Sequence, residues 1–204
     1  MDSEQKDLLK TVLKMFTKYG IKSVSMDDIA RELGISKKTL YTFVKDKNEL
    51  VEKAIDFQCK ERLHLMKSLN LESLPALQEV IEVSKIIDKT IGEFNPAFQY
   101  DLAKYFSPIY KKMMQINREA MSQSMLQNFK KGKQEGFYRP EIKEDLLVKM
   151  HISNVENMAE IQFYNSDEWT PDEIQQELFT YHMHAILTPL GLKEYKRLLT
   201  NNEK

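Results

Sequence analysis

The chain has 204 residues and contains little of what marks secreted and membrane proteins. It has a single cysteine, Cys59, so no disulfide can form within the chain and a reducing compartment is the default expectation. The first residues, MDSEQKDLLK, lack the apolar core of a signal peptide. No segment approaches the roughly 18 apolar residues that a membrane-spanning helix needs. We therefore expect a cytoplasmic protein with no membrane partner.

The sequence also lacks the motifs of common catalytic and cofactor-binding sites. It contains no GxSxG, Walker or GxGxxG pattern. Cys59 and His64 lie about one turn apart on an expected helix, but no third ligand joins them, and His182 and His184 fall on different helix faces. We therefore expect no enzymatic activity, no metal site and no cofactor.

A strong charge of one sign is missing as well, because the formal net charge is -1. The segment between Gly34 and Lys47 is nevertheless positively charged, because it contains four lysines (positions 37, 38, 45 and 47) and one acidic residue, Asp46. Phosphate attraction depends on the surface presented locally, since salt screens charges farther away than about 10 Å. The net charge therefore does not exclude nucleic acid as a partner.

Glycine and proline are scarce, with six of each, and they separate segments of helical periodicity. No segment has the alternating pattern of a strand. Besides two short helices near residue 34, the expected helices cover about residues 4–19, 47–69, 75–92, 96–106, 108–136, 141–164, 170–188 and 193–199. The pattern predicts an all-α fold of about nine to ten helices.

The segment SMDDIARELGISKKTLYTFVKDK, which begins at Ser25, organises the chain. It predicts two short helices joined at Gly34, because glycine adopts positive φ readily at a sharp turn. Ser25 can cap the first helix, with Asp28 completing a capping box, and Ser36 can cap the second. The residue types and their spacing together favour a helix-turn-helix.

The second of these helices has distinct apolar and polar faces. When its apolar residues point inward, its polar residues turn outward or lie on the flanks: Lys38, Thr42 and Lys45 outward, Thr39 and Tyr41 on the flanks. Such side chains suit phosphates and base edges. A helical hairpin with a solvated lysine face would share part of this pattern, but the caps and the turn glycine favour the helix-turn-helix.

The stretch IARELGISKKTLYTFVKDKNEL resembles the DNA-binding domain of TetR-family transcriptional repressors. The resemblance extends over about residues 6–55 and departs from the family at Lys38, where many members have glycine, and at Phe43-Val44. It implies an N-terminal three-helix head over residues 1–48, a linking helix to about residue 69, and a helical-bundle domain for ligand binding and dimerisation over residues 70–204. It also implies a homodimer on a palindromic DNA operator and release by a small-molecule inducer.

On this basis we expect the head to contact DNA through Ser25, Ser36, Lys37, Lys38, Thr39, Tyr41, Thr42, Lys45 and Lys47. Lys47 and Tyr41 are expected to hold phosphates. Lys38 and Thr42, with Thr39 and Lys37 beside them, are the candidates for base edges.

The C-terminal part is rich in methionine and aromatic residues, which line permissive pockets but more often form ordinary cores. With the family resemblance, they suggest a cavity for a largely apolar or aromatic ligand among Phe98, Tyr105, Tyr110, Met114, Met121, Met125 and Met158. The last two long helices are the family's usual dimerisation pair. Periodicity cannot distinguish side chains that face a second subunit from side chains that face the core of their own subunit. The candidate dimer-interface residues are Ile152, Val155, Ala159, Leu178, His182, Ala185 and Ile186.

Two other functions remain open at this point. The same fold could serve as a ligand-independent architectural or division-control DNA-binding protein, which would show no response to small molecules. An enzyme or carrier with a degenerate head would instead bind its ligand without specific DNA affinity, although the lysines around the second short helix argue against it.

Overall fold

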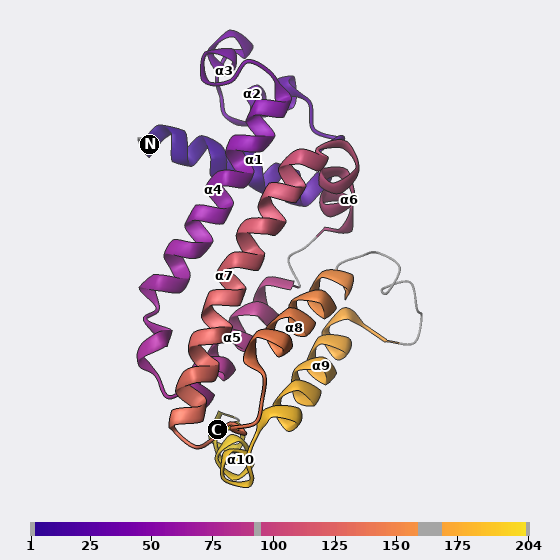
Figure 1. The fold of residues 1–204 in the computed structure, drawn as a ribbon. Helices are drawn as coiled ribbons and strands as arrows, with labels where there is room; N and C mark the ends of the chain where they lie inside the picture. Colours follow the sequence, from indigo (N-terminus) through magenta and orange to yellow (C-terminus); the bar gives the residue numbers. More distant parts are fainter. Residues whose placement is uncertain (1–2, 92–94, 159–168, 203–204) are drawn as a thin grey trace. The chain divides into compact units, whose positions relative to one another are not determined.

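The computed structural model describes residues 3–91, 95–158 and 169–202 (Figure 1). These residues form ten α-helices and one 3₁₀ helix: α1 Ser3–Tyr19, α2 Met26–Glu32, α3 Lys37–Phe43, α4 Lys47–Ser68, η1 Leu71–Ser73, α5 Ala76–Ile91, α6 Pro96–Tyr105, α7 Ser107–Gln134, α8 Glu144–Met158, α9 Pro171–Ile186 and α10 Pro189–Asn202. The described ranges contain no strand, only an isolated bridge between Tyr138 and Leu187. The expected all-α class is confirmed.

The chain divides into two compact units. The head unit comprises Met1–Ser68 with Glu93–Asn117, and the body unit comprises Leu69–Gly92 with Arg118–Lys204. This division differs from a simple boundary near residue 69, because α6 and the first part of α7 belong with the head. Lys112 in α7, for example, forms ion pairs with Asp56 at 2.8 Å and Glu52 at 3.3 Å, both in α4.

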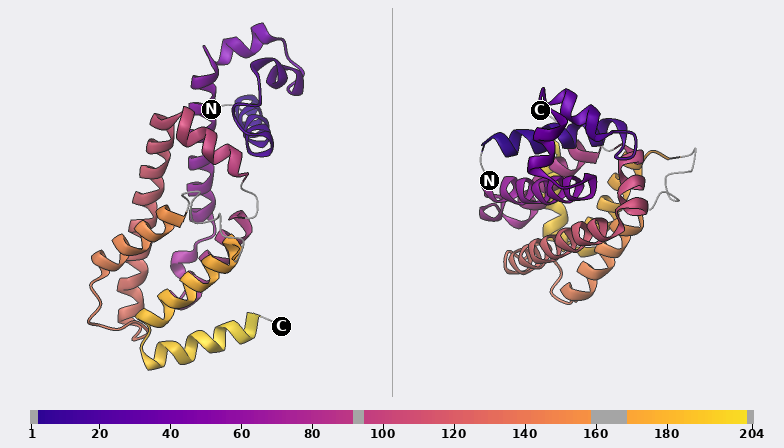
Figure 2. Two further views of the ribbon diagram at one scale, coloured as in Figure 1. Left: turned by 90° about the vertical axis from the view of Figure 1, so that its right-hand side faces the viewer. Right: turned by 90° about the horizontal axis from the view of Figure 1, so that it is seen from above.

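The head unit is built around one apolar core. Helix α1 crosses α4 (Figures 1 and 2), and its residues Val12 and Phe16 are fully buried, while its lysines at positions 6, 10, 14 and 18 are exposed. Leu40 of α3 and Leu50 of α4 are also completely buried. The i, i+3, i+4 pattern of the sequence therefore marks the faces that pack together.

Helix α6 packs against this core as well. Its residues Phe98 and Leu102 are buried among the residues of α1 and α4. The backbone N–H of Lys22 donates a 2.7 Å hydrogen bond to the carboxylate of Asp101, and Asn95 Nδ2 donates to the carbonyl of Lys18. These bonds attach α6 to the turn that leads from α1 into α2, directly beside the short helices of the head.

The body unit has its own core, formed by residues of α5, α7, α8, α9 and α10. Helices α8 and α9 lie side by side (Figures 1 and 2). Tyr138 is almost completely buried and packs directly on Gly132, where an added Cβ would lie 2.3 Å from the tyrosine ring. None of the described helices combines the length and apolar character that crossing a bilayer requires.

Candidate nucleic-acid interface and ligand cavity

The helix-turn-helix of the head is closed by two caps and a glycine turn. Ser25 and Asp28 form a reciprocal capping box, in which Ser25 N donates to Asp28 Oδ2 at 2.9 Å and Asp28 N donates to Ser25 Oγ at 3.1 Å. These bonds hold the pKa of Asp28 below its ordinary value. Gly34 has a φ of 66°, a backbone conformation that residues with a side chain rarely adopt. Space does not require a glycine here, because an added Cβ would meet no atom within 4 Å. Ser36 Oγ then accepts from Thr39 N at 3.0 Å at the start of α3.

Helix α3 presents a polar surface, as the sequence predicts. Leu40 points into the core, whereas the six polar residues expected on its outer face and flanks are all exposed: Lys37, Lys38, Thr39, Tyr41, Thr42 and Lys45. Thr42 Oγ1 donates to the carbonyl of Thr39 at 2.7 Å, and Ser36 Oγ lies 2.8 Å from Thr39 Oγ1. The hydroxyls of Ser25 and Ser36 are both engaged in caps, so either can reach DNA only while it also serves its helix.

The four lysines of this segment are not equivalent. Lys47 begins α4, but its ammonium group is half-buried and donates to the carbonyls of Ile21 at 2.6 Å and Val24 at 2.5 Å. Burial, together with the charge of Lys22, lowers the pKa of Lys47. The expected phosphate contact of Lys47 stays a prediction, and the structure adds a role within the head. Lys47 first ties the α1–α2 turn to α4, and only its remaining N–H is available for another partner.

Lys37, the first residue of α3, is also engaged. Its ammonium lies 2.9 Å from Asp27 Oδ1 and donates to Asp27 Oδ2 at 3.1 Å. The hydrogen bond and charge of Asp27 raise the pKa of Lys37. Lys38 and Lys45 have no side-chain hydrogen bond or ion pair with the described residues. Sequence reasoning counted all four charges as available, because local spacing does not reveal a contact between two helices.

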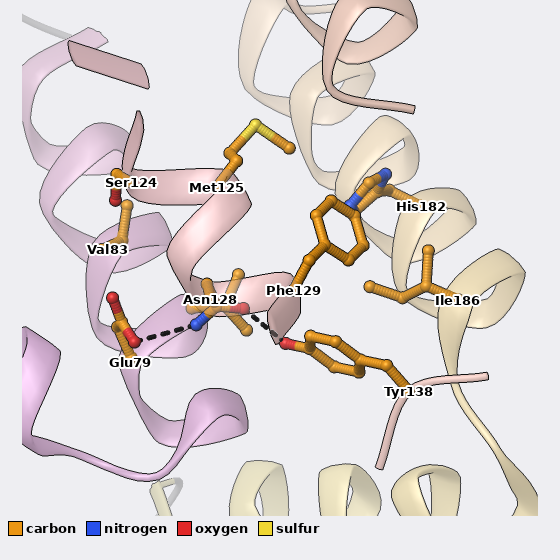
Figure 3. A pocket seen from close by; sticks show the side chains of 10 residues that line it. Glu79, Val83, Ser124, Met125, Asn128, Phe129, Tyr138, His182 and Ile186 are labelled. Atoms are coloured by element: carbon orange, nitrogen blue, oxygen red, sulfur yellow. Dashed lines mark hydrogen bonds between the residues drawn. The ribbon is translucent and has the colours of Figure 1, made fainter. Parts of the chain in front are cut away.

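The body unit contains a cavity of about 70 Å³ between α5, α7 and α9 (Figure 3). Its lining residues are Glu79, Val80, Val83, Ser124, Met125, Asn128, Phe129, Tyr138, His182 and Ile186. The wall is therefore mostly apolar, with a few polar groups, which is the usual composition of a small-molecule site.

The polar part of the wall is a hydrogen-bonded chain. Asn128 Nδ2 donates to Glu79 Oε2 at 2.9 Å and to the carbonyl of Ala76 at 3.0 Å, and the Tyr138 hydroxyl donates to Asn128 Oδ1 at 2.8 Å (Figure 3). Lys131 forms an ion pair with the buried Glu79. Burial and the nearby carboxylates raise the pKa of Tyr138, so its hydroxyl remains a donor. The chain thereby neutralises the one carboxylate of the wall.

His182 of α9 is an uncharged polar group of the same wall. Its ring lies 6.1 Å from that of Phe129 and 4.9 Å from that of His151 on α8. Burial and the neighbouring His151 lower the pKa of His182 to about 4, and burial lowers the pKa of His151. The imidazole of His182 is therefore neutral near pH 7.

The expected ligand-binding residues are divided between the two units. Only Met125 lines the cavity; Met121 packs against the body core. Phe98 is buried in the head core, Tyr110 packs against that core, and two more belong to the head unit, namely the exposed Tyr105 and the half-buried Met114. The side chain of Met158 lies outside the described residues. Periodicity along α6 and α7 shows no change where the chain passes from one unit to the other, and no sequence signal identified Glu79, Asn128 or Tyr138.

The expected dimer-interface residues lie in several different environments. Ile152 and Ile186 are buried in the core of their own body unit, and His182 lines the cavity. Val155, Leu178 and Ala185 are half-buried, and Ala159 lies outside the described residues. The outer surfaces of α8 and α9 instead carry exposed large side chains at Leu146, Met150 and Tyr181, of which Tyr181 is 70% exposed.

The described residues contain no cluster of metal-ligating side chains. Within those ranges, no three side chains of His, Cys, Asp or Glu gather as a metal ion would require. Cys59 is buried in the head core, and burial raises the pKa of its thiol, which makes it unreactive.

Comparisons with known proteins agree with this geometry. Residues 8–54 match the family described as "Bacterial regulatory proteins, tetR family". The chain is 23% identical over 176 residues to the uncharacterized HTH-type transcriptional regulator YvaF of Bacillus subtilis (strain 168), covering 85% of this chain and 90% of that protein.

Two solved structures show the same fold. One is a transcriptional regulator from Cytophaga hutchinsonii ATCC 33406, with a TM-score of 0.73 and 14% identity over 92% of this chain and 100% of that chain. The other is a putative transcriptional regulator from Saccharomonospora viridis in complex with choline, with a TM-score of 0.56 and 18% identity over the same shares of the two chains. Together with the capped helix-turn-helix, these similarities identify the protein as a DNA-binding transcriptional regulator with a TetR-family head over residues 8–54, rather than an enzyme.

Proposed function

We propose that the protein is a homodimeric repressor that binds a palindromic operator and leaves it when a small molecule occupies the body. The observation that carries the proposal is the exposed polar face of α3, presented by a helix-turn-helix whose caps and turn are complete. In such a motif the second helix enters the major groove, and two-fold symmetry of the protein matches a palindromic site.

Lys38 and Thr42 remain the proposed base-reading residues. Lys38 has an exposed side chain without a partner among the described residues, so it can approach a guanine edge without first breaking a contact. Tyr41 and Lys45 flank it and are proposed to hold phosphates, which orient the head on the duplex without reading sequence.

The proposed dimer interface is the outer surface of α8 and α9. Leu146 and Met150 are one turn apart on α8 and half exposed, and Tyr181 extends from α9. Large apolar side chains on adjacent helices favour an isologous four-helix contact with the same surface of a second subunit. We propose this surface in place of the inward-facing Ile152 and Ile186.

The proposed inducer is a small, uncharged, largely apolar or aromatic molecule. The cavity supports this chemistry because its carboxylate, Glu79, is already paired with Lys131 and Asn128, and His182 is neutral. A charged ligand would lose its hydration without gaining a free counter-charge. A structure of the same fold was solved in complex with choline, which supports small-molecule binding by this fold; choline is a cation, so it does not bear on the uncharged chemistry proposed for this cavity.

Release then requires that the inducer bind a DNA-incompetent state more tightly than the DNA-bound state. The cavity of about 70 Å³ is smaller than the usual 300–1,000 Å³ of ligand sites, so binding of a drug-sized inducer has to enlarge it. The small volume also favours a second candidate function, a ligand-independent DNA-binding protein of the same fold.

One experiment separates these functions. Genomic fragments from the source organism that bind the protein are selected and sequenced, and the recovered duplex is then used in a release screen with small neutral aromatic compounds. An inverted-repeat site and release by some compound support the repressor. A specific site that no compound releases favours the ligand-independent protein, and the absence of any preferred sequence contradicts both.

Cavity occupation is tested separately by Val83→Trp, which places a large ring where the cavity lies. This variant is expected to lose release by the compound while keeping operator affinity. Val155→Trp, on α8 of the same unit but outside the cavity wall, is the control.

A further inference from the structure

Asp27 places a negative charge beside the DNA-reading helix. It lies in the first turn of α2, and its carboxylate contacts the ammonium of Lys37, at the start of α3, at 2.9 and 3.1 Å. The side chains are 58% and 52% exposed, respectively. The pair therefore joins the first turns of the two helices of the motif at the surface, next to Lys38.

This contact changes the charge that the free head presents. Of the four lysines between Gly34 and Lys47, Lys37 is held by Asp27 and Lys47 donates to two backbone carbonyls. Lys38 and Lys45 alone in this segment have ammonium groups without a hydrogen bond or ion pair to the described residues. The electrostatic surface is consequently weaker than the sequence suggests.

The pair contributes little to folding, because exposed ion pairs of this kind are worth about 0–1 kcal/mol. Its effect on DNA binding is larger in principle, since a duplex presents a dense row of phosphates to the same surface. A phosphate that binds Lys37 must displace the Asp27 carboxylate, which then repels the phosphate from close by. If Lys37 stays paired with Asp27, the phosphate gains little attraction from this lysine.

Specific and non-specific duplexes differ at this step. On an operator, Lys37 has a partner in a fixed position, so transfer from Asp27 to DNA is compensated by a well-formed contact. On other sequences no such partner is in register, and Lys37 remains with Asp27. Removal of the carboxylate would therefore free a cation for loose phosphate contact mainly on non-specific DNA.

We infer that Asp27 is a specificity-determining residue, which acts through Lys37 to weaken binding to non-operator DNA more than binding to the operator. The inference rests on DNA binding through α3 and extends it to a residue of α2. Asp27 is a positioning residue in this scheme, because it holds Lys37 and is not itself a reader of bases.

The test is Asp27→Asn, which removes the charge and keeps the shape. Binding to a mixed-sequence 30-base-pair duplex, measured at several salt concentrations, is expected to strengthen by about threefold to fivefold, as gain of one exposed charge contact implies. The salt dependence should steepen by about one unit, because one more phosphate is neutralised. Binding to the selected operator should strengthen by less than about 1.5-fold, so the specificity ratio falls.

Glu32→Gln is the matched control. It removes one carboxylate from the same helix at another exposed position, where the charge acts on Lys18 of α1 rather than on α3. A second comparison introduces Asp27→Asn into a Lys37→Ala protein, where the gain should largely disappear. Thermal unfolding of each variant checks that the head is intact.

Three results would overturn the inference. These are equal strengthening on both duplexes, a gain no larger than that of Glu32→Gln, and a full gain in the Lys37→Ala background. The mixed-sequence measurement does not need an operator, so it tests the effect of Asp27 on non-specific binding even if the selection recovers no preferred site. Failure of the proposed repressor function and failure of this inference are thereby distinguished.

Discussion

Lys47 shows how one side chain can have a structural and a functional role at once. It ties the carbonyls of Ile21 and Val24 to the start of α4, close to the anion-attracting N-terminus of that helix. Its lowered pKa reflects the cost of burying the ammonium group, which the two carbonyls offset. A substitution here is therefore expected to affect folding as well as DNA affinity.

We predict that Lys47→Ala lowers the free energy of unfolding by about 1–3 kcal/mol, because two carbonyls lose a charged donor. It should also weaken binding to operator and scrambled duplexes in parallel and reduce the salt slope by about one unit if the third N–H holds a phosphate. Urea unfolding and salt-dependent titrations measure the two effects. Unchanged stability would show that the carbonyl contacts are unimportant.

Lys38 and Thr42 should behave differently from Lys47, because both are exposed and neither supports the fold. Replacing either residue with Ala is expected to reduce the free energy of binding to the operator by about 1–3 kcal/mol. The affinity for a scrambled duplex should change much less. Titration against duplexes with single base-pair changes should reveal one relaxed operator position for each variant. Parallel losses on both duplexes for Lys38→Ala would reject its assignment as a reader.

The neutral His182 predicts a pH effect on stability. In the unfolded chain this histidine takes up a proton near pH 6.5, whereas in the folded state its pKa is about 4. Between these values the unfolded state binds more protons, so the free energy of unfolding decreases as the pH falls.

Between pH 7 and pH 5 the loss attributable to His182 is expected to be on the order of 2 kcal/mol or less, since each unit of pKa difference corresponds to about 1.4 kcal/mol. His182→Gln should reduce this pH dependence, and His151, whose pKa is also lowered, should retain part of it. Urea unfolding at the two pH values provides the measurement. A variant with the same pH dependence as the original protein would contradict the assignment.

At the scale of whole elements, α8 and α9 face two environments. Ile152 and Ile186 pack into the body core, while Leu146, Met150 and Tyr181 are exposed on the outer surfaces. Exposed apolar side chains on two adjacent helices are unfavourable in water unless another surface covers them.

We predict that Met150→Asp weakens a dimer that is stable at micromolar concentration, because burial would leave the carboxylate unpaired. Sedimentation velocity measures the monomer fraction. Leu190→Asp, at an exposed apolar position on α10, is the control and should leave the dimer intact. A stable monomer in the original protein, or an unaffected dimer in Met150→Asp, would exclude this surface as the interface.

At the scale of the molecule, a dimer carries two heads, each with one α3. Such a protein is expected to protect two inverted half-sites with centres about 34–36 Å apart, or somewhat more if the heads splay. Footprinting on the selected operator tests this, and insertion of five base pairs between the half-sites, which turns them to opposite faces of the duplex, should abolish tight binding. Equal affinity for the altered spacing would indicate that the heads bind independently.

Features that depend on neighbouring residues could be predicted from the order of the amino acids. The capping box of Ser25, the N-cap of Ser36 and the inward side of α3 follow from spacings of three or four residues, because a helix repeats every 3.6 residues. The positive φ of Gly34 follows from the residue type, because glycine has no Cβ. The all-α class and the DNA-binding head were predictable for this reason, and both are confirmed.

Features that join distant segments could not be predicted in this way, because they depend on how the helices pack. The contact of Asp27 with Lys37, the bonds of Lys47 to the α1–α2 turn, and the grouping of Glu79, Asn128 and Tyr138 around a cavity all depend on helix packing. The inward orientation of Ile152 and Ile186 depends on it as well. Periodicity identifies an apolar face but not the surface that covers it, because core packing and subunit contact bury the same kinds of side chain.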